Sequence, residues 1–406
     1  LEKNDYVVEI CSSRNFIRTV KFWKPHIIIL NTVTQIERCK QIIPDSKIII
    51  WPGEGANRKS ASDPAIIKKK NIETSKIDLI LLWGLGTLNF FKDILPEVSF
   101  DKIKIVGNPK LDLIKFNSKL LENMNKDKEK KTIGVLTRHH ILNRYNWVPT
   151  IFSLTSLEKK DDVDWQVNTF TGIIHLLKKI IQETDYNISL RPHPLESIEG
   201  YKALFLDTSL AKEDFGNRIS IDNSADVATW CSNQRVIIST SSTSFHEVTL
   251  LQIPLINVDV LTKSEKLTKQ ITPHAAKSQE ISYLPSTYKE ALELICNVNL
   301  KPVKNLEIID HIESFNNFFN NNSAINNAAT EIKKIKIDKY NKLFFFPRFI
   351  LELIDFISVK RNLKIDPYHY NFSYYKFHHK IPKYLFNLIK NITNNKAVYL
   401  INKNDL

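Results

Sequence analysis

The chain has 406 residues, of which 43% are hydrophobic and 25% charged, and its net charge is +13. This composition excludes general disorder and a collagen-like or coiled-coil protein, and no uncharged apolar run approaches the roughly 18 residues of a membrane-spanning helix. The four cysteines lie far apart without a CxxC pair, which argues against a zinc site or disulfide framework and favours the cytoplasm. The chain begins at Leu1 and its one methionine is Met124, so we expect a longer polypeptide.

Short β-branched runs alternate with helical-period segments along the first part of the chain. The expected strands are Tyr6–Ile10, His26–Leu30, Lys47–Trp51, Asp78–Trp83 and Lys102–Val106, and the expected helices include Thr34–Ile43 and Leu85–Ile94. Such alternation predicts βαβ units and a parallel sheet that is covered on both faces.

A polar, highly charged stretch at residues 118–131 interrupts this pattern and is typical of a domain linker. A second series follows it. Its expected strands are Thr132–Leu136, Asn187–Arg191, Arg218–Ile221, Arg235–Ser239 and Pro254–Val258, and its expected helices are Val167–Thr184, Ala225–Ser232 and Ser244–Leu251. We therefore predict an α/β protein with two Rossmann-like lobes, residues 1–117 and 132–305, and a helical C-terminal segment, residues 306–406, that either stands apart or crosses back to the first lobe.

Ligands bind such sheets at the carboxyl ends of the strands, so the segments directly after strands are of most interest. The strand Asn187–Arg191 runs into Arg191-Pro192-His193-Pro194, a turn stiffened by two prolines. A histidine and an arginine fixed there can donate charge-assisted hydrogen bonds to a phosphate. The alternative is a structural turn whose buried histidine bonds to the backbone.

Six consecutive hydroxyl residues, Ser239 to Ser244, separate a predicted strand from a helix that begins near Phe245. One hydroxyl is enough to N-cap a helix, so the surplus favours binding of a phosphate or carboxylate. Glu247, one turn into this helix, is placed to bond a sugar hydroxyl. Its alternative role is that of a first-turn partner of the helix dipole.

Two segments of the first lobe carry further candidates. Glu54 lies between Gly53 and Gly55 after the third strand, where it is placed to accept a proton from an acceptor hydroxyl, unless it is simply a solvated residue of a glycine-rich turn. The sequence Gly107-Asn108-Pro109 ends the last strand with turn chemistry, and we expect Asp112 to N-cap the helix that follows.

The order of these motifs resembles the two-lobed glycosyltransferase fold called GT-B. An HP and an SS/T motif in the second lobe, with an acid-Gly motif in the first, are similar to those of the bacterial sialyltransferases, polysialyltransferases and β-Kdo transferases of surface polysaccharide assembly. His193 matches HP, and Ser242-Thr243 matches SS/T, with Ser241-Ser242 as the other register. Glu54-Gly55 matches only the second half of the acid motif, because Gly53 replaces its first acid. The resemblance spans residues 45–260.

This resemblance implies transfer of a Kdo- or sialic-acid-like sugar from a CMP-activated donor to a glycan or glycolipid acceptor of lipopolysaccharide or capsule. It implies that His193 binds the CMP phosphate and that Glu54 is the base of an inverting reaction. The residues expected to bind the donor are Arg191, His193, Ser241, Ser242, Thr243, Ser244 and Glu247. A retaining reaction would need a carboxylate nucleophile. We would seek it at Asp161, Asp162 or Asp164, whose alternative role is to satisfy a helix dipole.

The sequence predicts neither a cofactor nor a metal. It has no GxGxxG or GxxxxGK[ST] phosphate loop, and the adjacent pairs His139-His140 and His378-His379 are expected to point apart. No carboxylate triad is spaced for a divalent ion. We therefore expect metal-independent transfer.

Two other classes share part of this evidence. Transferases that use CDP-glycerol or CDP-ribitol as donors of a polyol phosphate have the same second-lobe HP and hydroxyl pattern. A non-catalytic nucleic-acid-binding protein is suggested by the pI of 9.3 alone. The chain before residue 331 is nearly neutral and holds no recognised binding module, so we expect no nucleic-acid partner.

The basic charge is concentrated at the C-terminal end. Residues 331–406 contain 15 Lys and Arg against 6 Asp and Glu, together with 15 aromatic residues. Basic residues that flank aromatic ones suit the interface of an anionic membrane. We expect this tail to dock the enzyme peripherally on the inner face of the cell membrane, with packing against the first lobe as the alternative.

Overall fold

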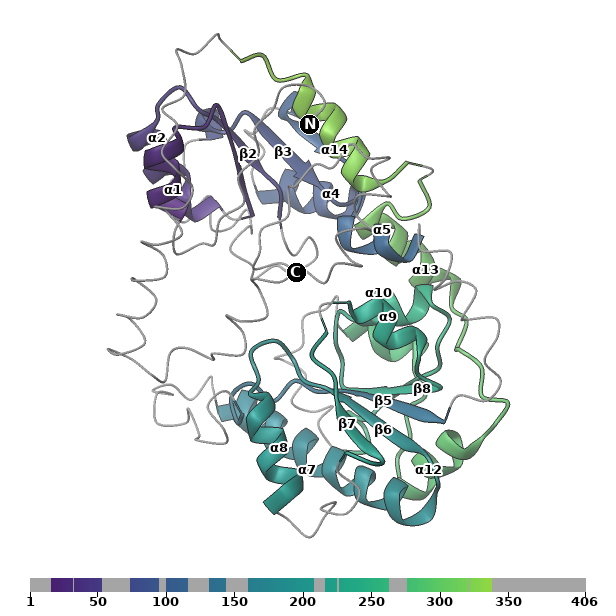
Figure 1. The fold of residues 1–406 in the computed structure, drawn as a ribbon. Coiled ribbons are helices and arrows are strands. Elements are labelled where there is room, and N and C mark those ends of the chain that lie inside the picture. Colours follow the sequence, from purple (N-terminus) through teal and green to yellow (C-terminus); the bar gives the residue numbers. More distant parts are fainter. Residues whose placement is uncertain are drawn as a thin grey trace. The chain divides into compact units, whose positions relative to one another are not determined.

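The structure is a computed structural model, and its description covers residues 16–31, 33–52, 74–94, 100–115, 131–143, 160–207, 216–224, 226–262, 276–320 and 322–337. The chain divides into two compact units (Figure 1). Unit 1 comprises Leu1–Phe116 with Asp310–Leu406, and unit 2 comprises Asn117–Ile309. The expected strand Tyr6–Ile10, the linker up to residue 130 and the tail beyond residue 337 lie outside the described residues.

Unit 1 contains a four-stranded parallel sheet in the order β1-β2-β3-β4. Its strands are β1 (Ile27–Leu30), β2 (Lys47–Ile50), β3 (Leu79–Leu82) and β4 (Ile103–Ile105). Its helices are α1 (Phe16–Trp23), α2 (Ile36–Ile42), α4 (Leu85–Ile94), α5 (Pro109–Lys115) and α14 (Ala324–Lys333), with α13 (Leu306–Asn316) reaching it from residue 310 on.

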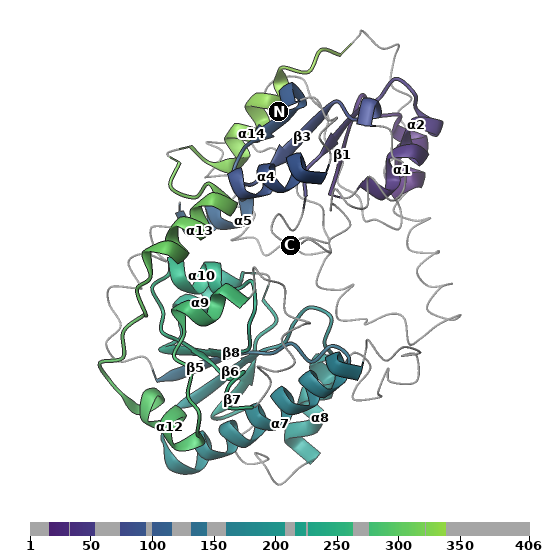
Figure 2. The ribbon, with the colours of Figure 1, turned by 180° about the vertical axis from the view of Figure 1, so that it is seen from behind.

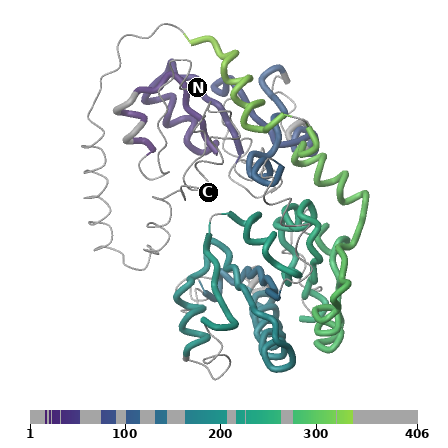
Figure 3. The backbone as a smooth tube through the Cα atoms, turned by 45° about the vertical axis from the view of Figure 1, so that its right-hand side comes forward, coloured from purple at the N-terminus to yellow at the C-terminus, as the bar shows by residue number. Residues whose placement is uncertain are grey.

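Both faces of this sheet are covered, which explains why its strands read as continuous apolar runs. In β2, Ile48 and Ile50 join the core beneath α2, whereas Ile49 joins a second core with Ala328 and Ile332 of α14. Neighbouring residues of a strand point to opposite faces, so one isoleucine run serves two cores. Figure 3 shows α14, in yellow-green, beside blue segments from the N-terminal part of the chain.

The turn after β4 attaches the returning helices to unit 1. Gly107 has a φ of +101°, and Asn108 donates its backbone N–H to Asn316 O at 2.9 Å and its amide to Asn316 Oδ1 at 2.8 Å. Our expectation that Asp112 N-caps the helix following it was wrong. Asp112 lies inside α5 and instead accepts hydrogen bonds from the N–H groups of Ala324 and Ile325, at 3.1 and 3.2 Å, in the first turn of α14. The start of α5 is capped by the side chain of Asn108, which accepts from Lys110 N.

Unit 2 contains a five-stranded parallel sheet in the order β7-β6-β5-β8-β9. Its strands are β5 (Thr132–Leu136), β6 (Asn187–Arg191), β7 (Ile219–Ile221), β8 (Val236–Ser239) and β9 (Leu255–Asn257). Its helices are α7 (Lys160–Glu183), α8 (Ile198–Asp207), α9 (Val227–Ser232), α10 (Phe245–Leu250) and α12 (Tyr288–Cys296), all visible in Figures 1 and 2.

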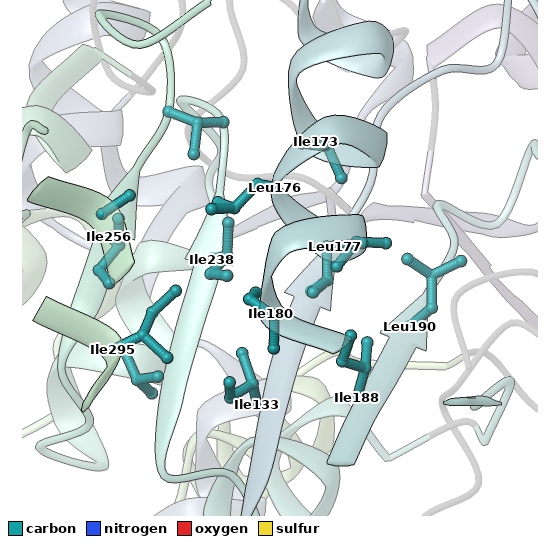
Figure 4. Close-up of a cluster of buried hydrophobic side chains, with 14 of the residues drawn as sticks. Ile133, Ile173, Leu176, Leu177, Ile180, Ile188, Leu190, Ile238, Ile256 and Ile295 are labelled. Atoms are coloured by element: carbon teal, nitrogen blue, oxygen red, sulfur yellow. The ribbon is translucent and has the colours of Figure 1, made fainter. Parts of the chain in front are cut away.

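The main core of unit 2 lies between the sheet and α7. Four residues of α7 at helical spacing, Ile173, Leu176, Leu177 and Ile180, form an apolar stripe over the strands (Figure 4). The stripe meets buried aliphatic residues of β5, β6 and β8, among them Ile133. The helix begins at Lys160, seven residues earlier than expected, because its first two turns are mostly polar and carry no apolar periodicity.

The expected α/β class with two Rossmann-like units is confirmed by the two parallel sheets. In unit 2 the chain starts at the central strand β5, extends one way to β6 and β7, and then crosses to β8 and β9 on the other side. The strand order therefore reverses between β5 and β8. Because all five strands are parallel, the turns that follow β5, β6 and β8 lie along one edge of the sheet, the edge where such folds bind ligands.

Candidate functional site

The turn after β6 holds His193 in one defined state. The backbone N–H of Leu195 lies 3.2 Å from His193 Nδ1, and a backbone N–H can only donate, so Nδ1 is the acceptor. The hydrogen of the neutral ring is then on Nε2. Burial, with smaller contributions from His140 and Arg138, lowers the pKa of His193 to about 4. At neutral pH this turn therefore presents an uncharged imidazole whose Nε2–H is a hydrogen-bond donor.

A second histidine reaches the same place from the turn after β5. The ring centroids of His140 and His193 are 5.7 Å apart. Arg138, on the same turn, stacks its guanidinium on the ring of Trp165 in α7 at 5.8 Å from the ring centroid. His140 and Arg138 both lower the pKa of His193, which places them close to its ring. Two imidazoles and one guanidinium thus gather at the ends of two neighbouring strands, an arrangement that suits a phosphate.

Behind these groups lies a carboxylate that sequence reasoning missed. The side chain of Glu196 is buried, and its Oε1 accepts from His139 N at 2.8 Å and from His193 N at 3.2 Å. Its Oε2 accepts from the hydroxyls of Thr137, at 2.8 Å, and of Tyr201, at 2.5 Å. Burial raises the pKa of Glu196 to about 6 against the opposing effect of these four hydrogen bonds.

His139 faces away from the candidate site, as expected for adjacent histidines. The residue is 1% exposed, and its Nδ1 lies 3.1 Å from the Tyr201 hydroxyl. Burial, then the neighbouring His140, lowers its pKa to about 3, so the ring is neutral. His139 is therefore part of the packing behind the turn, whereas His140 faces His193.

Arg191, the other expected phosphate ligand of the turn after β6, is held within unit 2. Its guanidinium pairs with Asp222, donates to the hydroxyl and carbonyl of Ser224, and lies over the ring of Trp230 at 5.6 Å from the centroid. These contacts attach the turn after β7 to the end of β6. A direct contact of Arg191 with a phosphate stays a prediction.

The hydroxyl run after β8 divides into a buried and an accessible part. Ser241 is fully buried, and both its N–H and its hydroxyl donate to Asp259 Oδ2, at 3.0 and 2.5 Å. Ser242 accepts from Ser244 N at 3.3 Å, and the Ser244 side chain makes no cap hydrogen bond to α10. Thr243 is exposed, while Ser242 and Ser244 are half-buried. The run does not serve as an N-cap, and of the two SS/T registers only Ser242-Thr243 keeps both hydroxyls at the surface.

The structure describes some, but not all, of the remaining predicted site residues. Glu247 is half-buried in the first turn of α10. Asp161 and Asp162 lie in the first turn of α7, where carboxylates satisfy the helix dipole, but their side chains are outside the description, and Asp164 is half-buried in the next turn. Glu54 lies outside the described residues. The structure thus brings His193 together with His140 and Arg138, and it leaves the acceptor base and any nucleophile as predictions.

Within the described ranges, no group of three or more His, Cys, Asp or Glu side chains could hold a metal ion. None of the helices in those ranges is long and apolar enough to cross a membrane.

Comparisons with known proteins return structural similarities only. No family model matches the chain, and no curated protein matches it in sequence. The wall teichoic acid polymerase TagF superposes with a TM-score of 0.44 at 15% identity, over 72% of this chain and 70% of TagF. The UDP-GlcNAc 2-epimerase of Methanocaldococcus jannaschii gives 0.43 at 14% identity, over 79% and 80%. MnaA of S. aureus, solved with UDP, gives 0.43 at 13% identity, over 82% of each chain. Similarity at this level assigns the chain to no family and carries no activity to it.

Proposed function

We propose that this chain is a GT-B glycosyltransferase that moves a sugar acid, of the Kdo or sialic acid kind, from a CMP-activated donor to a bacterial surface glycan. The observation that carries the proposal is the neutral His193 imidazole, whose Nε2–H is available at the carboxyl edge of the unit 2 sheet beside His140 and Arg138. The motif order supplies the donor class. The grouping of His193, His140 and Arg138 supports a phosphate as the bound group.

The leaving group in such a transfer is the CMP phosphate, which gains negative charge as the bond to the sugar breaks. His193 donates from Nε2 to a phosphate oxygen, and the positive field of Arg138 favours the same charge. Preorganised donors of this kind stabilise a developing anion more effectively than water does, because they need no reorientation during the reaction. Protein side chains therefore supply the charge stabilisation that a metal supplies in other transferases.

The remaining roles follow from the motif resemblance. Ser242 and Thr243 bind the donor's carboxylate or phosphate, Glu247 bonds a sugar hydroxyl, and Glu54 removes the proton of the acceptor hydroxyl. A reaction that retains the anomeric configuration would assign the nucleophile to Asp164 or its neighbours instead. The product's anomeric configuration, read by NMR, separates the two routes.

A donor panel tests the proposal. Purified protein is incubated with acceptor glycan and CMP-Kdo, CMP-sialic acid, CDP-glycerol or CDP-ribitol, with and without EDTA, and CMP release is measured. We expect release from a CMP-sugar acid that EDTA does not reduce. Release from a CDP-polyol alone would contradict the proposed donor class and favour polyol-phosphate transfer, and loss of activity in EDTA would contradict metal independence.

A further inference from the structure

We infer that Glu196 is a positioning residue that holds the turns after β5 and β6 in fixed register and thereby sets the spacing of the His140 and His193 imidazoles. That the bound group is a donor phosphate rests on the proposed function. That Glu196 holds the two turns together does not depend on the proposed function.

The hydrogen bonds of Glu196 Oε1 join the two turns just beyond the last backbone bond of the β5–β6 ladder, which runs from Thr137 N to Arg191 O. One bond comes from His193 N, the backbone of the residue that carries the first imidazole. The other comes from His139 N, one residue before the second imidazole. Because both N–H groups point at a single oxygen atom, their separation cannot exceed two hydrogen-bond lengths. A change at Glu196 would therefore release both rings at once.

The other oxygen of Glu196 fixes the carboxylate itself. Thr137, at the end of β5, and Tyr201, in α8, donate to Oε2, and the Tyr201 hydroxyl also lies near His139 Nδ1. Glu196, Thr137, Tyr201 and His139 are buried, with at most 6% of each residue exposed. Hydrogen bonds shielded from water in this way are costly to break, because an unpaired buried group recovers nothing from solvent.

Stability does not explain why a carboxylate occupies this place. Burial raises its pKa to about 6, which means that the ionised form is less favoured in the folded protein than in the unfolded chain. A second link already joins the turns farther out, where Asn143 accepts from Ser197 N at 2.6 Å and donates to Ser197 O at 2.8 Å. The fold therefore has a further link between the two turns, whereas Glu196 is the group that bonds directly to the backbone of His193 and of the residue before His140.

Two substitutions separate positioning from charge. In Glu196→Gln the amide keeps one oxygen to accept from His139 N and His193 N, while its NH₂ donates to the oxygens of Thr137 and Tyr201. Glu196→Leu has similar size and accepts nothing. The matched control is Asp112→Leu, which removes another buried carboxylate that accepts two backbone N–H bonds, but in unit 1.

Two measurements are made on each variant of the full chain: CMP affinity by titration calorimetry, and the protonation state of the histidine nitrogens by ¹⁵N NMR. We expect Glu196→Gln to retain wild-type affinity and the Nε2–H form of His193. Glu196→Leu should weaken CMP binding at least about tenfold, the equivalent of one charged hydrogen bond, and should lose the single His193 tautomer. Asp112→Leu should change neither.

The following outcomes would contradict the inference or the proposed function. If Glu196→Gln loses as much affinity as Glu196→Leu, the charge matters and the positioning role is wrong. If Glu196→Leu keeps both affinity and tautomer, Glu196 holds nothing that matters to the site. If the wild-type protein does not bind CMP, the proposed function fails, and the NMR comparison still tests the positioning. Should Glu196→Leu not fold, Tyr201→Phe removes one of the four donors, and unchanged CMP affinity in that variant would overturn the inference.

Discussion

His139 and His140 are adjacent in the sequence and have different surroundings. The His139 ring packs edge-on against Phe170, at 5.4 Å between centroids, whereas the His140 ring lies beside His193. Because the two histidines are adjacent in the sequence, we expect their rings to point apart, but adjacency does not say which ring faces the candidate site. His139 is held on the buried side by its backbone hydrogen bond to Glu196, a partner 57 residues further along the chain.

The first prediction concerns His193. Replacement by alanine removes the Nε2–H donor, and we expect catalytic efficiency with the active donor to fall on the order of 100-fold, as for the loss of one preorganised donor to a developing anion. The control is His175→Ala, which changes an exposed histidine of α7 whose ring lies 4.4 Å from that of Tyr288, between centroids. Steady-state kinetics and the melting temperature are measured together. Wild-type kinetics with a lowered melting temperature would show that His193 is structural.

The second prediction follows from the pKa of Glu196, which burial raises from 4.5 to about 6. A carboxyl whose pKa is higher in the folded state binds its proton more tightly there. Its stabilising contribution is therefore complete below pH 4.5 and is lost as the pH rises through 6. The loss amounts to about 2 kcal/mol in the free energy of unfolding.

The variant Glu196→Gln has no proton to lose at this position. The difference in unfolding free energy between this variant and wild type should therefore shift in favour of the variant by about 2 kcal/mol between pH 4.5 and pH 7. Denaturant titrations at four or five pH values measure it, and other titrating groups cancel in the difference. A constant difference across this range would contradict the prediction.

At the scale of elements, α14 depends on a carboxylate from a distant part of the sequence. The change Asp112→Ala leaves the N–H groups of Ala324 and Ile325 without their acceptor, and a lost cap of this kind costs about 1–2 kcal/mol. We expect faster amide hydrogen exchange throughout α14, measured by mass spectrometry. The control Asp45→Ala changes an exposed carboxylate of unit 1 and should leave that exchange unaltered. Equal exchange in both variants would show that α14 is held by apolar packing alone.

The strands were predictable and the caps were not. Each described strand coincides with a β-branched run to within one or two residues, because sheets covered on both faces demand continuous apolar sequence. The sequence around Asp112 has the form of a local helix start, yet its carboxylate binds residues more than 200 positions away. Glu196 was overlooked for a related reason: it lies three residues after His193, and its four donors come from the turns after β5 and β6 and from α8.

At the scale of the whole molecule, the basic tail stays a prediction, since residues 338–406 lie outside the described residues. We expect the intact chain to co-sediment with anionic vesicles and to be released at high salt, because each cation near such a surface contributes about 1 kcal/mol. The proper comparison is a chain that ends after Ile337. Truncation near Thr330 would cut α14 and remove the buried Ile332. If both chains stay in the supernatant, the tail does not dock on membranes.

The hydrogen bonds between Asp112 and the first turn of α14 can form only late in the synthesis of the chain. The ribosome synthesises unit 1 as two separate stretches of sequence. The second stretch, from Asp310, is synthesised only after the whole of unit 2. At about 5–20 residues per second, close to 200 residues impose a delay on the order of 10 to 40 seconds. During that interval α14 has not yet been synthesised, so it cannot cover the side of the sheet that carries Ile49, Trp51 and Trp83. Unit 2, whose sequence is continuous, can therefore complete its fold and its candidate phosphate site before residues 310–337 are available to cover the sheet of unit 1.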